Sequence, residues 1–154
     1  MKKLVALAMA VMLSVVFLAG CGANEAADST ENAPMQYTTA ADVKEALDSG
    51  KDNYVVLDVR QDADFQKDGI AGAYGADMHE ANKEGDLADG EAKMKAALKE
   101  ATGSETSNGE EIVLVCYSGK SYAQAGTNAL DAIGVDVKNV YTLEGGMEEW
   151  AKVQ

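Results

Sequence analysis

Two runs of consecutive apolar residues stand out along the chain, at residues 54–58 and 112–116. Runs of this length without polar alternation are typical of strands that are buried on both faces. The segments around them place apolar residues at helical spacing. We expect helices over 40–47, 91–100 and 121–133 and in a terminal segment containing Trp150, a helical turn over 62–67, short strands over 73–76 and 139–142, and loops over 77–90 and 103–109. Strands that alternate with helices predict an α/β fold, with a mostly parallel sheet of about five strands covered by helices on both faces.

Each of the two predicted buried strands ends in a residue whose side chain can take part in chemistry. Asp58 ends the first strand and Cys116 ends the second. In open parallel sheets, ligands bind beyond the carboxyl ends of the strands. The sequence therefore predicts a site at this edge of the sheet.

The amino-terminal segment has the pattern of an export signal. Lys2 and Lys3 precede an apolar run over residues 4–18, which is shorter than a membrane span and ends in small residues. Residues 18–21, Leu-Ala-Gly-Cys, resemble the bacterial lipobox, in which the cysteine is acylated. We expect residues 1–20 to be a lipoprotein signal peptide and Cys21 to carry the lipid, with the domain held outside the cytoplasm on the cell membrane or the outer membrane. An ordinary signal peptide cut nearby is the alternative.

Composition sets the domain organisation and excludes one class of partner. Residues 21–36 are small, polar and acidic, which predicts a flexible tether, and residues 37–154 have the length of one domain. The net charge of −13 argues against a nucleic-acid binder of the usual basic kind. The chain has two cysteines, so a lipid on Cys21 leaves Cys116 as the only free thiol.

The segment after the second buried strand is the strongest candidate for chemistry. It joins the strand to a predicted helix through a glycine, so its backbone N–H groups and the helix N-terminus can stabilise a thiolate. Glycine permits the tight turn, and the hydroxyls and the lysine add polar contacts. The candidate active-site loop consists of Cys116, Tyr117, Ser118, Gly119, Lys120 and Ser121.

Four segments in order resemble the single-domain rhodanese sulfurtransferases. Residues 58–60, Asp-Val-Arg, are similar to the first signature, and residues 69–73 to the Gly-His-Ile-Pro-Gly-Ala segment, without its His and Pro. Residues 116–121 are similar to the six-residue loop that begins with the catalytic Cys and has Gly at its fourth position. Residues 143–150 resemble the closing Leu-x-Gly-Gly-x-x-x-Trp signature. The resemblance extends over the whole predicted domain.

The resemblance implies a rhodanese-like fold and a two-step sulfur transfer. A donor such as thiosulfate or mercaptopyruvate gives its outer sulfur to Cys116, and a thiol or cyanide then takes it from the persulfide. The thiol acceptor can be a small molecule or a carrier protein. Cys116 is the expected nucleophile, and the backbone N–H groups of the loop are expected to hold the persulfide charge. No metal or organic cofactor is expected.

Three other functions compete with this one. A rhodanese-fold module that only binds or carries sulfur is the main alternative, since a fold does not fix a function. A phosphatase or arsenate reductase of the related fold needs a longer loop that ends in Arg, but Tyr122 stands at that position and Arg60 is the only arginine. A thioredoxin-like oxidoreductase lacks its second cysteine near Cys116.

Several polar residues also have a purely structural interpretation. Arg60 is expected to support the site with Asp58 by linking loops through carboxylates. The Lys120 side chain is equally consistent with a solvated surface charge and with a contact to the sulfur donor. His79 is expected at the surface, because no set of metal ligands surrounds it. The acids of residues 77–91 lack the spacing of a calcium loop.

Overall fold

The two apolar runs form neighbouring strands in the centre of the sheet. In the computed structural model, which describes residues 31–154, β2 spans Tyr54–Asp58 and β4 spans Glu111–Val115. They pair in parallel along their whole length, with Tyr54 opposite Glu111 and Asp58 opposite Val115. The carboxyl ends of both strands therefore meet at one edge of the sheet, as the sequence predicted.

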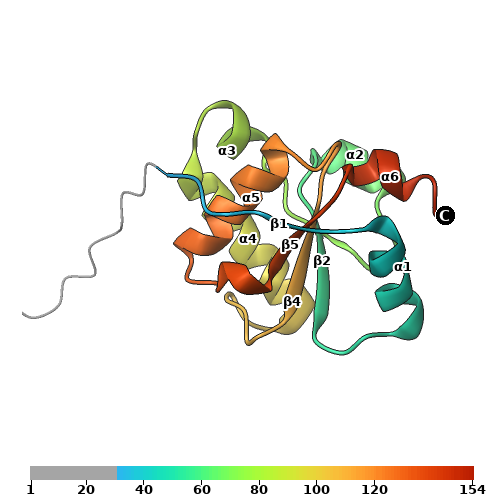
Figure 1. Ribbon diagram of the computed structural model, residues 1–154. Coiled ribbons are helices and arrows are strands. Elements are labelled where there is room, and N and C mark those ends of the chain that lie inside the picture. Colours follow the sequence, from blue (N-terminus) through green and yellow to red (C-terminus); the bar gives the residue numbers. More distant parts are fainter. Residues whose placement is uncertain (1–30) are drawn as a thin grey trace, which may run out of the picture.

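Three shorter strands complete the sheet (Figure 1). They are β1 (Gln36–Thr38), β3 (Tyr74–Gly75) and β5 (Val140–Leu143). The strand order is β1-β5-β4-β2-β3, and every pair is parallel. This arrangement confirms the predicted α/β fold with a five-stranded parallel sheet.

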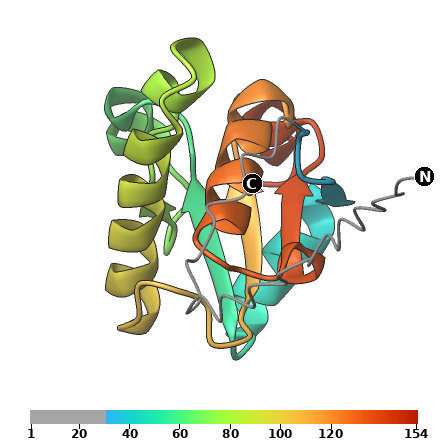
Figure 2. The same ribbon diagram turned by 90° about the vertical axis from the view of Figure 1, so that its left-hand side faces the viewer.

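Helices cover both faces of the sheet (Figures 1 and 2). The helices are α1 (Ala40–Ser49), α2 (Asp62–Asp68), α3 (His79–Lys83), α4 (Leu87–Thr102), α5 (Ser121–Ala132) and α6 (Gly146–Trp150), with a 3-10 turn η1 (Val137–Asn139). The layer of α3, α4 and α5 faces the viewer in Figure 2. The other face carries α1 and α6. No helix in the described range 31–154 is long and apolar enough to cross a membrane.

The central strands supply side chains to two separate cores. Leu57 and Leu114 pack into the core under α4 and α5, whereas Val56 and Val113 pack into the core with α1 and α6. All four are at most 1% exposed. Alternate residues of one strand point to opposite faces, so the absence of polar alternation follows directly from the two-sided burial.

The prediction of a loop over residues 77–90 is wrong. This segment contains α3 and the start of α4, whose first turn is capped by Asp86 through a hydrogen bond of 3.0 Å from the Asp89 N–H. Gly90, which suggests a loop in the sequence, is a helix residue at a close contact. A Cβ at this position would lie 3.0 Å from the Cβ of Ala81 and 3.5 Å from that of Ala129. The glycine lets α3, α4 and α5 approach one another.

The folded domain includes residues before position 37. Strand β1 includes Gln36, and Ala33 is fixed against α5. Its N–H donates to Asn128 Oδ1 at 2.9 Å, and its carbonyl accepts from Gln124 Nε2 at 2.8 Å. The end of the segment predicted as a tether is therefore part of the folded domain. The predicted signal peptide and Cys21 lie outside the described residues.

Candidate active site

Cys116 directly follows β4 at the carboxyl edge of the sheet, and the loop that it begins leads into α5. The thiol is buried, with 2% of the residue exposed. The Gly119 N–H donates a hydrogen bond of 3.1 Å to Cys116 Sγ. A backbone N–H aimed at sulfur at the start of a twelve-residue helix stabilises negative charge on that sulfur.

Gly119 is required at its position for two reasons. Its φ is +70°, in the left-handed region that favours glycine. A Cβ here would lie 2.7 Å from the carbonyl oxygen of Leu143 and 3.0 Å from the Gly145 nitrogen. The loop therefore folds directly against the end of β5.

The Gly-Gly turn after β5 packs directly against the backbone of the cysteine loop. Gly146 has a φ of +58°, and a Cβ on it would lie 2.3 Å from the Cys116 carbonyl oxygen and 2.7 Å from the Ser118 nitrogen. The Met147 N–H donates to that same carbonyl at 2.9 Å. The closing signature of the sequence thus holds the backbone of the cysteine loop.

The remaining polar groups of the loop face outward to different degrees. Lys120 stands before the first residue of α5 and is exposed, as is Ser121, whereas Ser118 is half-buried. Lys120 makes no ion pair with any residue in the part of the chain that the structure describes. Its ammonium is therefore free to meet an anion that approaches the loop.

The Tyr117 side chain connects the loop to α2. Its hydroxyl donates to Asp64 Oδ2 at 2.6 Å and accepts from the Gln61 N–H at 3.3 Å. Burial raises the pKa of the Tyr117 phenol, and the hydrogen bond to Asp64 and the charge of that carboxylate raise it further. The phenol is therefore neutral at physiological pH, and its hydrogen is already used inside the protein.

His79 is not a free surface residue, which corrects the expectation from the sequence. It is half-buried, and its Nδ1 lies 2.8 Å from the hydroxyl of Tyr122 in the first turn of α5. The Tyr122 ring meets that of Tyr117 edge to face, with 5.3 Å between the ring centroids. Burial raises the pKa of Tyr122, and the charges of Asp77 and Asp64 raise it further.

Asp58 and Arg60 form a buried ion pair beneath the site. Arg60 Nη2 lies 2.8 Å from Asp58 Oδ2, and both side chains are at most 4% exposed. Arg60 Nη1 lies 2.7 Å from Asp68 Oδ1 at the end of α2. Burial alone would lower the pKa of Arg60, but the hydrogen bonds and charges of the two carboxylates outweigh it and raise the pKa above its usual value. Arg60 links the end of β2 to α2 through the carboxylates of Asp58 and Asp68.

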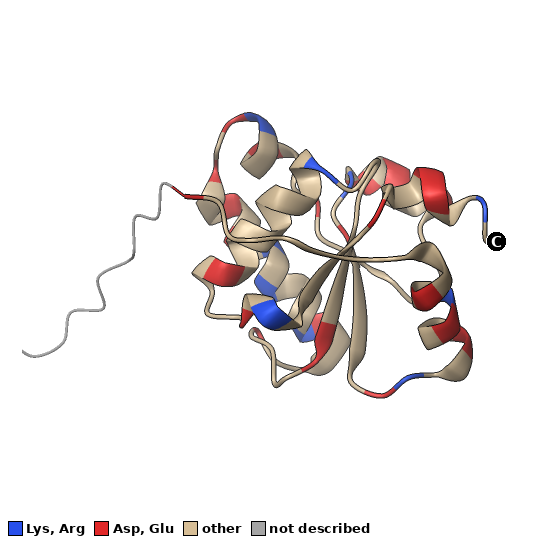
Figure 3. Ribbon diagram, in the orientation of Figure 1, with Lys and Arg blue, Asp and Glu red and all other residues tan. Residues whose placement is uncertain are grey.

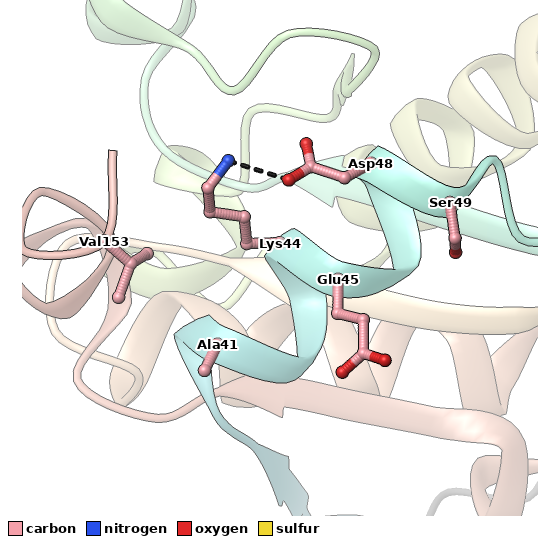
Figure 4. A pocket seen from close by; sticks show the side chains of 6 residues that line it. All are labelled: Ala41, Lys44, Glu45, Asp48, Ser49 and Val153. Carbon is pink, nitrogen blue, oxygen red and sulfur yellow. Dashed lines mark hydrogen bonds and ion pairs between the residues drawn. The ribbon is translucent and has the colours of Figure 1, made fainter.

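The acidic residues and the cavity found elsewhere in the described part of the molecule do not belong to this site. Acidic residues are spread over helices on both sides of the sheet (Figure 3). Within residues 31–154, no group of three or more His, Cys, Asp or Glu residues could hold a metal ion. A cavity of about 510 Å³ lies between α1 and the segment after α6, with Val153 facing Ala41 and Lys44 (Figure 4). Its lining is completed by Glu45, Asp48 and Ser49 and includes no residue of the cysteine loop.

The structure brings together more residues than the sequence indicated. The predicted loop residues and the Asp58–Arg60 pair lie at one edge of the sheet. Two further side chains, Asp64 and Tyr122, contact Tyr117 of the loop, and His79 contacts Tyr122. Tyr122 follows the loop directly in sequence, but nothing local to Asp64 or His79 indicates the contacts that they make across the fold.

Comparison with known proteins shows the family to which the chain belongs. A family model described as "Rhodanese-like domain" matches residues 39–153, and the chain therefore belongs to the rhodanese-like family. No curated protein matches the chain closely enough to count as a relative.

Solved structures show the same fold at low sequence identity. A single-domain sulfurtransferase from Saccharomyces cerevisiae is 16% identical with a TM-score of 0.56, covering 79% of this chain and 92% of its own. A human single-domain sulfurtransferase is 18% identical with a TM-score of 0.54, covering 79% and 99%. A Rhodopseudomonas palustris protein described as a possible tyrosine phosphatase is 19% identical with a TM-score of 0.53, covering 77% and 81%.

Proposed function

We propose that the chain is a sulfurtransferase that moves a sulfane sulfur from thiosulfate or a similar donor to a thiol or cyanide through a persulfide on Cys116. The observation that carries this proposal is the hydrogen bond of 3.1 Å from the Gly119 N–H to Cys116 Sγ. It lies at the N-terminus of α5, in a loop of the kind found in the family's enzymes. The residue needed as nucleophile thus stands where its anion is stabilised.

The first step forms the persulfide. The Cys116 thiolate attacks the outer sulfur of thiosulfate, a bond forms between the two sulfurs, and the original sulfur–sulfur bond of the donor breaks. Sulfite leaves with the electron pair. The negative charge then rests on the outer sulfur of Cys116, where the loop N–H groups and the helix N-terminus stabilise it.

The second step returns the enzyme to its starting state. An acceptor thiolate attacks the outer sulfur, the sulfur–sulfur bond of the persulfide breaks, and Cys116 regains its electron pair. The acceptor, either a small thiol or a thiol of a carrier protein, leaves as a persulfide; with cyanide the product is thiocyanate. Neither step uses a metal, an organic cofactor or an external oxidant.

A mass measurement tests the enzyme against a module that only carries or binds sulfur. The full chain, purified in detergent, is incubated with thiosulfate, and its peptides are weighed. We expect one added sulfur atom on the peptide containing Cys116, its removal by cyanide in repeated cycles, and no addition in Cys116→Ser. A single loading without turnover would favour the carrier module, and no loading would contradict the proposal.

A phosphatase has less support, because a phosphatase loop grips its oxyanion with a guanidinium fork. Arg60 is held by Asp58 and Asp68 and is 3% exposed, so its fork is already occupied. Tyr122 stands where the longer loop would end. Hydrolysis of p-nitrophenyl phosphate that is lost in Cys116→Ser would reverse this choice.

We also propose that the domain works outside the cytoplasm on a membrane, held by a lipid on Cys21. The support is the sequence of residues 1–21. We expect the full chain to sediment with membranes and to partition into detergent, and Cys21→Ala to be released after signal cleavage or to remain unprocessed. Cleaved Cys21→Ala protein that stays bound to membranes would contradict lipidation.

A further inference from the structure

The imidazole of His79 is fixed in direction by the backbone that carries it. His79 is the only histidine of the chain and begins α3. Its N–H donates to Asp77 Oδ1 at 2.8 Å, and the other oxygen of that carboxylate accepts from the Asp62 N–H at 3.1 Å. Asp77 therefore ties the start of α3 to the start of α2, and it orients His79 toward α5.

The imidazole of His79 contacts a residue of α5, the helix that follows the cysteine loop. Tyr122 is 9% exposed, and its hydroxyl lies 2.8 Å from His79 Nδ1. Its ring packs against Tyr117, and it shares a packed core with Cys116. Burial is the main cause that raises the pKa of the Tyr122 phenol, followed by the charge of Asp77. The phenol is thus a neutral donor beside the nucleophile.

The two phenols beside the loop differ in whether the hydroxyl hydrogen is already engaged in a hydrogen bond. The Tyr117 hydrogen is used by Asp64 at 2.6 Å. The Tyr122 oxygen can instead accept a hydrogen from His79 when the imidazole carries its proton on Nδ1, because a phenol both donates and accepts. In that arrangement the hydrogen of Tyr122 stays available to a bound molecule.

We propose that His79 is a positioning residue that holds Tyr122 so that its hydroxyl donates a hydrogen bond to the group leaving the donor sulfur when Cys116 attacks. This inference rests on the proposed sulfur transfer and concerns its first step. As the donor's sulfur–sulfur bond breaks, the electron pair moves onto the leaving sulfite or sulfinate, and the Tyr122 hydrogen bond stabilises the charge that develops there. The phenol keeps its proton throughout, so the leaving group departs as an anion.

The test compares donors whose leaving groups differ in basicity. Ring-substituted benzenethiosulfonates give their outer sulfur to a thiolate and release a benzenesulfinate, which leaves less readily as it becomes more basic. The rate of persulfide formation is measured by rapid mixing and intact mass for each donor with the full chain in detergent. A lost hydrogen bond to the leaving group slows the poorest donors most, whereas general damage to the fold slows all donors alike.

We expect His79→Ala to lower the rate about tenfold for the most basic leaving group and about twofold for the least basic one. The ratio between donors does not depend on how much of the protein is active, so it stays meaningful if the variant is partly unfolded. His79→Asn, whose amide nitrogen can take the place of Nδ1, should recover most of the wild-type ratio. Tyr122→Phe should give the same change as His79→Ala, and the double variant should add nothing further.

Glu80→Ala is the matched control, because Glu80 is the exposed neighbour of His79 on α3. It should behave as wild type with every donor. If His79→Ala slows all donors by one factor, or if Asn fails to recover the ratio, His79 has only a structural role and the inference is wrong. If the wild-type chain forms no persulfide with any donor, the proposed function itself fails, which separates the two outcomes.

Discussion

The backbone N–H of Met147 donates a hydrogen bond of 2.9 Å to the carbonyl oxygen of Cys116. This bond joins the turn that closes the domain to the first residue of the cysteine loop. The close approach of Gly146 to the same carbonyl has the same effect. The conformation of the loop therefore depends on β5 and α6 as well as on its own sequence. Substitutions in that turn should alter the position of the Cys116 thiol.

Substitution of Gly146 by Ala should destabilise the domain and distort the loop. The new Cβ would lie 2.3 Å from the Cys116 carbonyl, in a residue whose φ is +58°. We expect a loss of about 3–5 kcal/mol in the free energy of unfolding, from the left-handed backbone and the clash together. Urea unfolding and persulfide formation measure the two effects.

Gly72→Ala is the control for this substitution. Gly72 has a φ of +83° but nothing within 4 Å of the added Cβ. The Gly72→Ala variant should lose only about 1–2 kcal/mol in the free energy of unfolding and retain persulfide formation. Equal losses in the two variants would show that contact with the loop adds nothing to the cost of the backbone conformation.

Substitution of Lys120 by Ala should weaken the reaction with anionic donors. Lys120 is exposed at the start of α5 and unpaired among residues 31–154, and charges farther from the loop than the screening length of ~8 Å contribute little. Loss of about 1 kcal/mol of attraction lowers kcat/KM for thiosulfate about fivefold. Steady-state kinetics at rising salt should narrow the gap between variant and wild type.

Lys138→Ala serves as the control for Lys120→Ala. Lys138 is also exposed, but it lies in η1, before β5 and thus at the opposite edge of the sheet. It should leave kcat/KM for thiosulfate unchanged. If Lys120→Ala also has no effect at low ionic strength, the lysine does not contact the donor.

Removal of one partner of the Asp58–Arg60 pair should be costly. Asp58→Asn leaves the Arg60 guanidinium buried beside a neutral amide, with only Asp68 as a charged partner. We expect a loss of about 3 kcal/mol or more in the free energy of unfolding, measured by urea denaturation.

The surface pair Lys44–Asp48 provides the comparison for that loss. Its side chains are 41% and 66% exposed, and Lys44→Ala should change stability by about 0.5 kcal/mol or less. Similar small losses for both substitutions would contradict the expected cost of leaving the buried Arg60 guanidinium without the Asp58 carboxylate.

Alkaline unfolding should report on Tyr54. Burial, with the charges of Glu111 and Asp42, raises the pKa of Tyr54 from 10.0 to about 12. Between these values the folded state holds a proton that the unfolded state has lost, so the free energy of unfolding falls as pH rises. In Tyr54→Phe this part of the pH dependence should be absent. An unchanged slope between pH 10 and 12 would contradict the assignment of the raised pKa.

The sequence determined the central strands and the position of Cys116. The predicted run 54–58 coincides with β2, and the run 112–116 differs from β4 by one residue at each end. These elements are readable because burial on both faces leaves a local signal, an unbroken apolar run. The placement of Cys116 at the carboxyl edge then follows from parallel pairing, which the alternation of strands and helices predicts.

Other elements depend on contacts that no local pattern records. Strand β1 has three residues and an exposed Tyr37, and it exists as a strand because its backbone pairs with β5. Helix α3 and the start of α4 are polar, and they are fixed by packing around Gly90. In both cases the stabilising partner is distant in the sequence, so the segment alone resembles a tether or a loop.

The surroundings of the cysteine were decided by the tertiary structure. His79 and Tyr122 are 43 positions apart in the sequence, and Tyr117 and Asp64 are 53 apart. Each pair meets because the parallel sheet brings the segments that follow β2, β3 and β4 to one edge. Sequence spacing can indicate that a thiol stands at such an edge, but which side chains border it depends on how the helices pack around the sheet.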